Sequence, residues 1–178
     1  MLSAICEIRE RFASLRRKLK VLMALAVGDK CPEFILKDQN NTDFDIKKVL
    51  GKQVLVIYFY PKDDTPGCTA EACSFRDSYE EFKDLGCEVI GISSDSPEKH
   101  AKFAEKHRLS FTLLADTSRT VRKLFGVPGN LFGLIPGRVT YIIDKKGTIR
   151  HIYNSLTNAA GHIRESINAV KSIIHEEA

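Results

Sequence analysis

The cysteine at position 68 stands where a thiol can become a nucleophile. It follows an apolar run, residues 54–60, and a loop that contains Pro61 and Pro66, and it directly precedes a helical pattern that begins at Thr69. A thiol in the first turn of a helix lies near unpaired backbone N–H groups and the positive end of the helix dipole. Because these groups favour the thiolate over the thiol, we expect Cys68 to be reactive.

A helix terminus supplies only about 1–2 kcal/mol of such stabilisation, so a cation has to supply much of the rest. Arg138 is the best candidate, because it ends a Gly/Pro-rich loop and opens a predicted strand at residues 139–143. Its fixed charge and multiple donors can hold both a thiolate and a substrate oxygen. Thr65, three residues before the thiol, can place its hydroxyl beside the sulfur, and Pro61 and Pro66 stiffen the loop.

The elements that must position these residues alternate between strands and helices. Strands are predicted at residues 34–37, 43–45, 54–60, 89–93, 111–115, 139–143 and 149–153, and helices at residues 69–85, 97–107, 118–125 and around 163–174. Asn40-Asn41 and residues 144–147 mark the turns of two hairpins. This order predicts an α/β domain of three layers, in which helices flank a central mixed sheet.

The composition fits one globular domain preceded by a basic appendage. Of the 178 residues, 43% are hydrophobic and 28% are charged, which allows a stable core without disulfide staples. Residues 1–26 carry six Lys or Arg and two Glu, whereas the predicted domain, residues 27–178, carries 21 basic and 21 acidic residues. That balance argues against a nucleic-acid partner. Five cysteines, an odd number, favour a reducing compartment, so we expect a cytoplasmic location.

The appendage, residues 1–26, has the pattern of an amphipathic helix. Its apolar residues recur three or four positions apart: Ile5, Ile8, Phe12, Leu15, Leu19 and Leu22. Four interpretations remain open. The appendage is a transit peptide to an organelle stroma or matrix, a helix that contacts a membrane surface or a partner, a secretory signal, or a segment without a native role because translation starts at Met23. No apolar run approaches the roughly 18 residues of a membrane span.

The spacing of the candidate site residues resembles that of a known family. Pro61, Thr65 and Cys68 reproduce the signature P-x-x-x-T-x-x-C of peroxiredoxins. Arg138, followed by Val-Thr-Tyr-Ile-Ile-Asp, looks like the active-site arginine of that family. Cys73, five residues after Cys68 and followed by Ser-Phe-Arg-Asp, resembles the branch called bacterioferritin comigratory protein or peroxiredoxin Q.

This resemblance runs from about residue 27 to residue 174 and implies a thioredoxin-like fold. It implies an enzyme that needs no cofactor and reduces hydrogen peroxide and organic hydroperoxides, usually at the expense of thioredoxin. Cys68 would then be the peroxidatic cysteine, whose sulfenic acid condenses with Cys73 as the resolving cysteine. Thr65 and Arg138 would position the peroxide, and Glu71 would orient Arg138. We expect a monomer or a weak dimer.

The spacing of the two cysteines sets a condition on that disulfide. Five residues along an ideal helix place two Cα atoms roughly 8–9 Å apart, whereas a disulfide needs less than about 7 Å. If Cys68 and Cys73 both lie on the predicted helix, its first turns must unwind before the bond can close. We therefore expect oxidation to lower the helicity of this segment.

Two other classes of function are alternatives. A metal-binding module could use Cys68 and Cys73, but one C-x4-C pair without a second pair, and histidines without ligand spacing, disfavour it. A thioredoxin-like redox sensor or thiol-disulfide exchange protein without peroxidase turnover is the other, although an exchanger usually carries C-x-x-C, which is absent. The remaining cysteines, Cys6, Cys31 and Cys87, are interpreted as structural or incidental.

Overall fold

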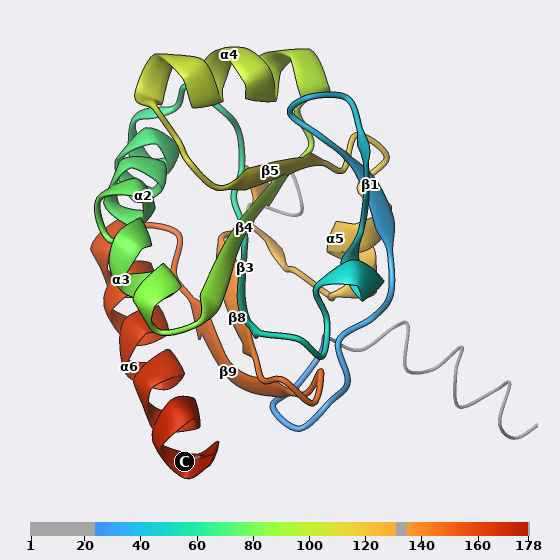
Figure 1. The fold of residues 1–178 in the computed structure, drawn as a ribbon. Helices are drawn as coiled ribbons and strands as arrows, with labels where there is room; N and C mark the ends of the chain where they lie inside the picture. The colour runs from blue at the N-terminus through green and yellow to red at the C-terminus, as the bar shows by residue number, and fades with distance from the viewer. Residues whose placement is uncertain (1–23, 131–134, 178) are drawn as a thin grey trace, which may run out of the picture.

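The computed structural model describes residues 24–130 and 135–177, which fold around one central sheet (Figure 1). The strands are β1 (Ile35–Asp38), β2 (Asp43–Asp45), β3 (Val54–Phe59), β4 (Cys87–Ser93), β5 (Thr112–Ala115), β6 (Gly129–Asn130), β7 (Ile135–Pro136), β8 (Val139–Ile143) and β9 (Ile149–Asn154). The helices are the 3-10 helix η1 (Ile46–Lys48) and the α-helices α2 (Pro66–Asp77), α3 (Tyr79–Asp84), α4 (Pro97–His107), α5 (Thr120–Leu124) and α6 (Ala159–Glu177). The helix predicted for the appendage lies outside the described residues.

Seven strands form a mixed sheet in the order β2-β1-β5-β4-β3-β8-β9. Strands β3, β4 and β5 run parallel, and β8 pairs antiparallel with β3. All residues of β3 are buried, as expected for a central strand that is covered on both faces. The end of β3 meets the start of β8 at the pair Phe59 and Val139. The loop after β3 and the residue before β8, Arg138, are therefore brought to the same edge of the sheet.

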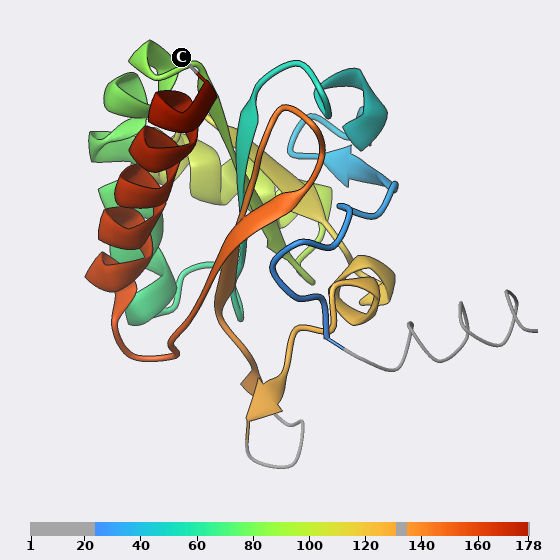
Figure 2. The ribbon, with the colours of Figure 1, turned by 90° about the horizontal axis from the view of Figure 1, so that it is seen from below.

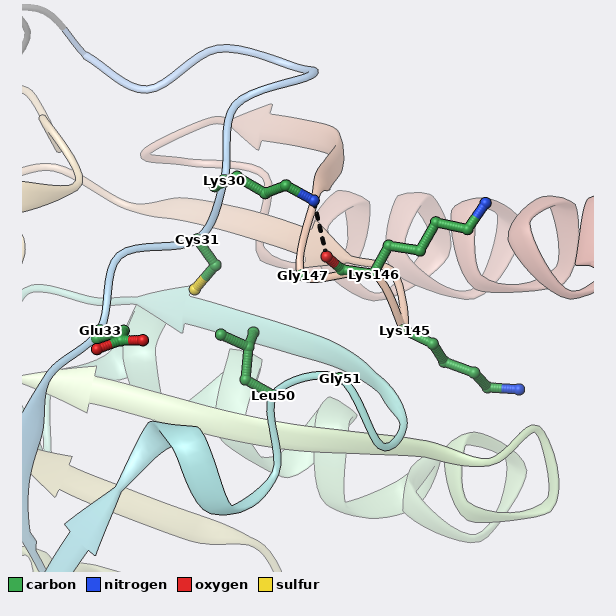
Figure 3. A pocket seen from close by; sticks show the side chains of 8 residues that line it. All are labelled: Lys30, Cys31, Glu33, Leu50, Gly51, Lys145, Lys146 and Gly147. Carbon is green, nitrogen blue, oxygen red and sulfur yellow. Dashed lines mark hydrogen bonds between the residues drawn. The ribbon is translucent and has the colours of Figure 1, made fainter.

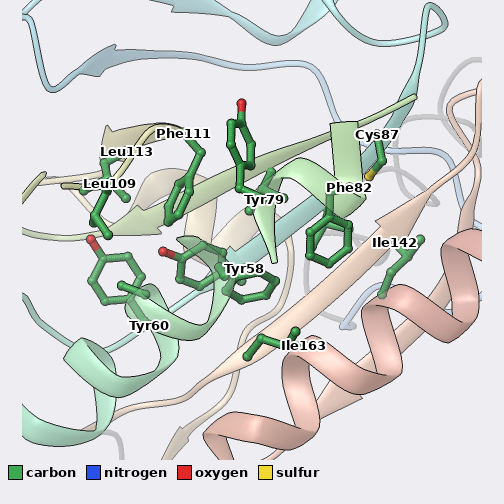
Figure 4. Close-up of a cluster of buried hydrophobic side chains, with 14 of the residues drawn as sticks. Tyr58, Tyr60, Tyr79, Phe82, Cys87, Leu109, Phe111, Leu113, Ile142 and Ile163 are labelled. Carbon is green, nitrogen blue, oxygen red and sulfur yellow. The ribbon is translucent and has the colours of Figure 1, made fainter. Parts of the chain in front are cut away.

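Alternate residues of β3 point into two separate cores, because side chains of a strand alternate between its faces. Val56 and Tyr58 face α2, α3 and α6, whereas Ile57 and Phe59 face α5 and the N-terminal hairpin (Figure 2). Tyr58 lies inside the first core (Figure 4), where its ring stacks on Phe75 of α2 with centroids 4.6 Å apart. This stacking fixes α2 on the sheet.

The predicted helix at residues 69–85 proved to be two helices, α2 and α3, separated at Ser78. Ser78 has φ −100° and ψ 4°, which is not helical geometry. Moreover, α2 begins at Pro66, three residues earlier than predicted. Proline suits the first helical position, because its φ is already helical and its missing N–H would have no partner there. Cys68 consequently lies inside the first turn of the helix.

The other predicted elements are present with small shifts at their ends. The helix predicted at residues 118–125 is shorter and covers Thr120–Leu124. The ribbon of β6 and β7 was not predicted, since two-residue strands carry no periodic pattern. The two hairpins and the mixed sheet between helices are confirmed. Among the described helices, none has the length and apolar character needed to cross a membrane.

Candidate active site

Cys68 lies at the third position of α2, directly after the loop that leaves β3. The first hydrogen bond of the helix joins the Thr69 N–H to the Thr65 carbonyl at 2.9 Å. The N–H groups of Gly67 and Cys68 therefore have no acceptor within the helix and remain available to an anion. The side chain of Cys68 is buried, with 1% of its surface exposed.

Arg138 brings a guanidinium group to this sulfur. Its Nη2 donates to the Cys68 Sγ at 3.2 Å, its Nη1 donates to Glu71 Oε2, and its Nε donates to the Leu156 carbonyl at 3.3 Å. Arg138 is only 3% exposed. Because all three nitrogens have partners, the group is fixed in one orientation. The structure thus brings together Cys68, Glu71 and Arg138, three of the residues that the sequence singled out.

Glu71 lies one turn after Cys68 on α2 and is fully buried. Burial raises the pKa of Glu71 to about 8, and the positive charge of Arg138 opposes this rise. No hydrogen-bond donor of the described residues reaches its second oxygen, Oε1. The carboxyl group is consequently neutral to a large extent near pH 7, which leaves much of the Arg138 charge available to the sulfur.

His162, a residue that the sequence interpretation missed, lies next to Glu71. Its Nδ1 is 3.6 Å from Glu71 Oε1 and 2.6 Å from the Thr140 hydroxyl, and its Nε2 donates to the Ser155 carbonyl at 2.8 Å. Burial, and secondarily the charge of Arg138, lower the pKa of His162 to about 4. The imidazole is therefore neutral, with Nδ1 accepting the Thr140 hydroxyl proton. No spacing in the sequence connects His162 with Cys68, because α6 meets the site only through the fold.

Thr65 and Pro61 flank the sulfur without a direct bond to it. The Thr65 hydroxyl donates to the Lys62 carbonyl at 3.0 Å, so its one proton is engaged within the loop. Only the oxygen lone pairs of Thr65 remain for the site. Pro61 follows the last residue of the buried strand run, Tyr60, and is half-buried.

A second network of buried hydrogen bonds holds the loop between Pro61 and Cys68. Asp63 accepts the Tyr60 hydroxyl at 2.7 Å and contacts His100 Nδ1 of α4 at 2.7 Å. The backbone N–H of Asp63 donates to the Asp95 carboxylate at 2.9 Å. The sequence interpretation missed these partners, since Asp63 reads as an ordinary loop acid and His100 as an ordinary helix residue. Together they fix the loop that delivers Cys68.

Cys73 shares α2 with Cys68, as the condition on the disulfide assumed. It is half-buried, and its Sγ lies 4.0 Å from His107 Nδ1 at the end of α4. Arg76, on the same helix, donates to the His107 carbonyl at 2.7 Å. Ideal helix geometry keeps the two cysteine Cα atoms roughly 8–9 Å apart in this state. Cys73 therefore packs against α4 and away from the Cys68 sulfur.

The other described cysteines are not part of this constellation. Burial raises the pKa of Cys31 to about 12 and also raises that of Cys87, so both stay as thiols. Cys31 lines a pocket of about 370 Å³ beside the β8–β9 turn (Figure 3), at the end of β8 that lies away from Arg138. No group of three potential metal ligands occurs among the described residues. Cys6 lies outside the described residues.

Comparison with known proteins places this geometry in a family. The profile of the AhpC/TSA family matches residues 27–152. Peroxiredoxin Q, chloroplastic, of Populus jackii is 51% identical over 146 residues, which cover 82% of this chain and 68% of that protein. The protein of the same name from Sedum lineare is 48% identical over 157 residues, which cover 88% and 84%.

Solved structures of similar fold belong to the same group of proteins as these sequence relatives. Peroxidoxin BcpB from Mycobacterium tuberculosis superposes with a TM-score of 0.78 at 35% identity and covers 84% of this chain and 98% of its own. Peroxiredoxin Q from Xanthomonas campestris gives a TM-score of 0.72 at 30% identity, with 79% and 91% covered. The predicted thioredoxin-like fold is confirmed. The chain belongs to the AhpC/TSA family and, within it, to the peroxiredoxin Q branch of thiol-dependent peroxidases.

Proposed function

We propose that this peroxiredoxin reduces hydrogen peroxide and organic hydroperoxides through a sulfenic acid on Cys68 and a disulfide between Cys68 and Cys73, which thioredoxin or a similar dithiol then reduces. The observation that carries the proposal is the Arg138 guanidinium, held 3.2 Å from the Cys68 sulfur by Glu71 and Leu156. A fixed cation in a buried site favours the thiolate and can also bind a peroxide oxygen.

In the first step, the Cys68 thiolate attacks the nearer oxygen of the hydroperoxide, and the O–O bond breaks. The sulfur is oxidised to a sulfenic acid, while the leaving oxygen departs as an alkoxide or hydroxide and takes up a proton from solvent to become alcohol or water. Arg138 and the free N–H groups of the first turn of α2 stabilise the charge that develops on the leaving oxygen. The hydroxyl oxygen of Thr65 can accept a hydrogen bond from the hydroperoxide O–H group.

In the second step, the Cys73 thiol condenses with the Cys68 sulfenic acid, forming one S–S bond and releasing one water molecule. Since α2 keeps the two sulfurs apart, the helix has to unwind from its first turns, and Cys73 has to leave His107. A dithiol such as thioredoxin restores both thiols by thiol-disulfide exchange.

Thiol counting tests this proposal. One equivalent of hydrogen peroxide is mixed with the reduced protein in a stopped-flow instrument, and the free thiols are counted over time for wild type, Cys68→Ser and Cys73→Ser. We expect wild type to lose two thiols rapidly, Cys68→Ser to lose none at that rate, and Cys73→Ser to accumulate a sulfenic acid. The proposal fails if wild type keeps its thiols or if Cys68→Ser reacts equally fast.

The reductant needs a separate measurement. Steady-state consumption of hydroperoxide with reduced thioredoxin should continue in wild type and cease in Cys73→Ser. Rapid loss of two thiols without turnover by any dithiol would identify a redox sensor instead of a peroxidase.

The appendage of residues 1–26 fits a transit peptide to an organelle stroma. The relatives from Populus jackii, Sedum lineare and Arabidopsis thaliana are named as chloroplastic proteins, which supports this interpretation over a cytoplasmic location. Cell fractionation of the full chain and of a chain lacking residues 1–26 tests it. Identical distribution of the two chains would contradict it.

A further inference from the structure

Arg122 is a buried cation that the proposed chemistry does not use. It belongs to α5, which covers the face of the sheet opposite α2, and is 7% exposed. Its Nη1 donates to the Gly137 carbonyl at 2.8 Å, and its Nη2 donates to the Tyr60 carbonyl at 2.7 Å. One planar guanidinium thus joins two backbone segments that are far apart in the sequence.

The two carbonyl groups stand at the points from which the active-site residues depart. Tyr60 directly precedes the loop that leads to Cys68, and Gly137 directly precedes Arg138. Regular pairing of β3 with β8 ends at Phe59 and Val139. Beyond that pair, the Arg122 side chain ties the two departing segments together.

Arg122 is itself held firmly. The Asp116 carboxylate, also buried, accepts the backbone N–H of Arg122 at 2.7 Å and that of Val121 at 3.2 Å. The guanidinium lies 5.6 Å from the centre of the Phe59 ring. An Arg side chain with this many partners can transmit its position to the backbone it contacts.

The charge of Arg122 also interacts with the site. Burial lowers the pKa of Arg122 to about 10, so the group stays positive at neutral pH. The Asp116 carboxylate opposes this lowering most, and Cys68 and Tyr141 in their ionised forms oppose it less, whereas the Arg119 charge adds to it. Arg122 is therefore a buried cation that interacts electrostatically with Cys68 in addition to joining the two backbone segments.

We propose that Arg122 is a positioning residue of the peroxidase site, which holds Cys68 and Arg138 in their mutual geometry and adds a second buried positive charge to the site. The proposal rests on the proposed role of Cys68. Arg122 does not contact the peroxide. It acts through its hydrogen bonds to the Tyr60 and Gly137 carbonyls and through the electrostatic effect of its positive charge.

Two substitutions separate the geometric effect from the charge effect. Arg122→Lys keeps the charge but reaches only one carbonyl, whereas Arg122→Gln removes the charge. Lys123→Gln is the matched control, because it removes an exposed positive charge from the same helix without contacting either carbonyl. For each full-length variant, the rate of Cys68 oxidation by hydrogen peroxide is measured by stopped flow from pH 5 to pH 9, beside the thermal midpoint of unfolding.

We expect both Arg122 variants to oxidise about ten- to a hundredfold more slowly than wild type, since small misplacements of reacting groups cost rates of this order. Arg122→Gln should also move the midpoint of the pH–rate profile upward, while Arg122→Lys and Lys123→Gln keep it. If Arg122→Gln does not fold, the proposal is tested by comparing the oxidation rate of Arg122→Lys with that of wild type.

The proposal is overturned if the folded fraction of each Arg122 variant reacts at the wild-type rate with the wild-type midpoint. A purely structural role would give that result together with a lower thermal midpoint. Cys68→Ser in the same series tells this failure from a failure of the proposed function. In the latter case, wild type and Cys68→Ser would oxidise at the same rate.

Discussion

At the scale of single residues, the site is a row of buried polar groups behind one sulfur. Arg138 contacts Cys68 on one side and Glu71 on the other, and His162 lies next to Glu71. Burial disfavours charge in this row, so that Glu71 has a raised pKa and His162 a lowered one. The row therefore holds one lasting positive charge, on Arg138, directed at the sulfur.

Glu71→Gln tests whether a neutral Glu71 is what the site uses. Because the pKa of Glu71 is raised to about 8, the carboxylate becomes the main form above that pH and then neutralises Arg138. We expect wild type to lose peroxidase rate above pH 8, whereas Glu71→Gln, which stays neutral, keeps its rate there. At pH 7 the two should agree within about threefold, since Gln has nearly the shape of a protonated Glu. Pre-steady-state rates from pH 6 to pH 9.5 measure this, and an identical alkaline decline in both proteins would refute it.

Arg138→Lys and Arg138→Ala test the cation itself. Removal of a donor aimed at a developing negative charge costs about a hundredfold or more in rate. Arg138→Ala should reach that loss and shift the pH–rate profile upward, because the thiolate of Cys68 loses its partner. Arg138→Lys should keep part of the pH behaviour but not the rate, since one ammonium cannot contact Cys68, Glu71 and Leu156 together. An unchanged profile for Arg138→Ala would contradict the electrostatic argument.

At the scale of elements, α2 has two tasks that oppose each other. Its folded first turn exposes backbone N–H groups beside Cys68, and Phe75 fixes it on the sheet through Tyr58. The same folded helix keeps Cys73 beside His107 and out of reach of Cys68. The stability of α2 is therefore expected to assist oxidation of Cys68 and to slow formation of the disulfide.

Ala70→Gly tests this expectation, because Ala70 is exposed on α2 between the two cysteines. Glycine in a helix interior costs about 1 kcal/mol relative to alanine, so unwinding should become about fivefold easier. We expect the disulfide to form about fivefold faster after peroxide is added, which quenched-flow thiol counting measures. Lys102→Gly, at an exposed position of α4, is the control and should leave this rate unchanged. A rate equal to wild type in Ala70→Gly would mean that unwinding does not limit the step.

At the scale of the whole molecule, the site couples stability to pH through α6. The folded protein keeps His162 neutral until about pH 4, whereas an unfolded histidine takes up a proton near pH 6.5. Between these values the unfolded state binds more protons, so the free energy of unfolding falls as the pH falls. His162 alone should account for about 3 kcal/mol of that loss.

His162→Gln removes this contribution. Urea unfolding at several pH values should show that the difference between wild type and His162→Gln shrinks as the pH falls from 6.5 to 4. Glu71 contributes with the opposite sign in this range, because its raised pKa favours the folded state at lower pH, so the difference between variants is the quantity to compare. His175→Gln, an exposed position of the same helix, is the control. A constant difference across this range would refute the assignment to His162.

Features that are local in the sequence could be predicted, and those that depend on the assembled fold could not. The strand, loop and helix around Cys68 follow from neighbouring residues, and Arg138 from its place at a strand start. The end of α2 at Ser78 was not predicted, because the helical spacing of apolar residues continues across it. These residues are Ala72, Phe75, Tyr79 and Phe82.

The supporting residues were missed for a different reason. Arg122 acts on two carbonyl groups, and backbone carbonyls have no sequence signature. Likewise, His100 and His162 meet their partners across loops and helices that only the folded chain brings together.

Because both cysteines lie on one helix, formation of the disulfide has to compete with further oxidation of Cys68. In the proposed mechanism, the sulfenate of Cys68 can attack a second peroxide molecule before the disulfide forms, which breaks the O–O bond of that peroxide and oxidises the sulfur to the sulfinic state. This second reaction can occur only during the time between oxidation of Cys68 and unwinding of α2. On this proposal, the lifetime of the twelve-residue helix α2 determines how much peroxide the enzyme can meet before Cys68 is overoxidised.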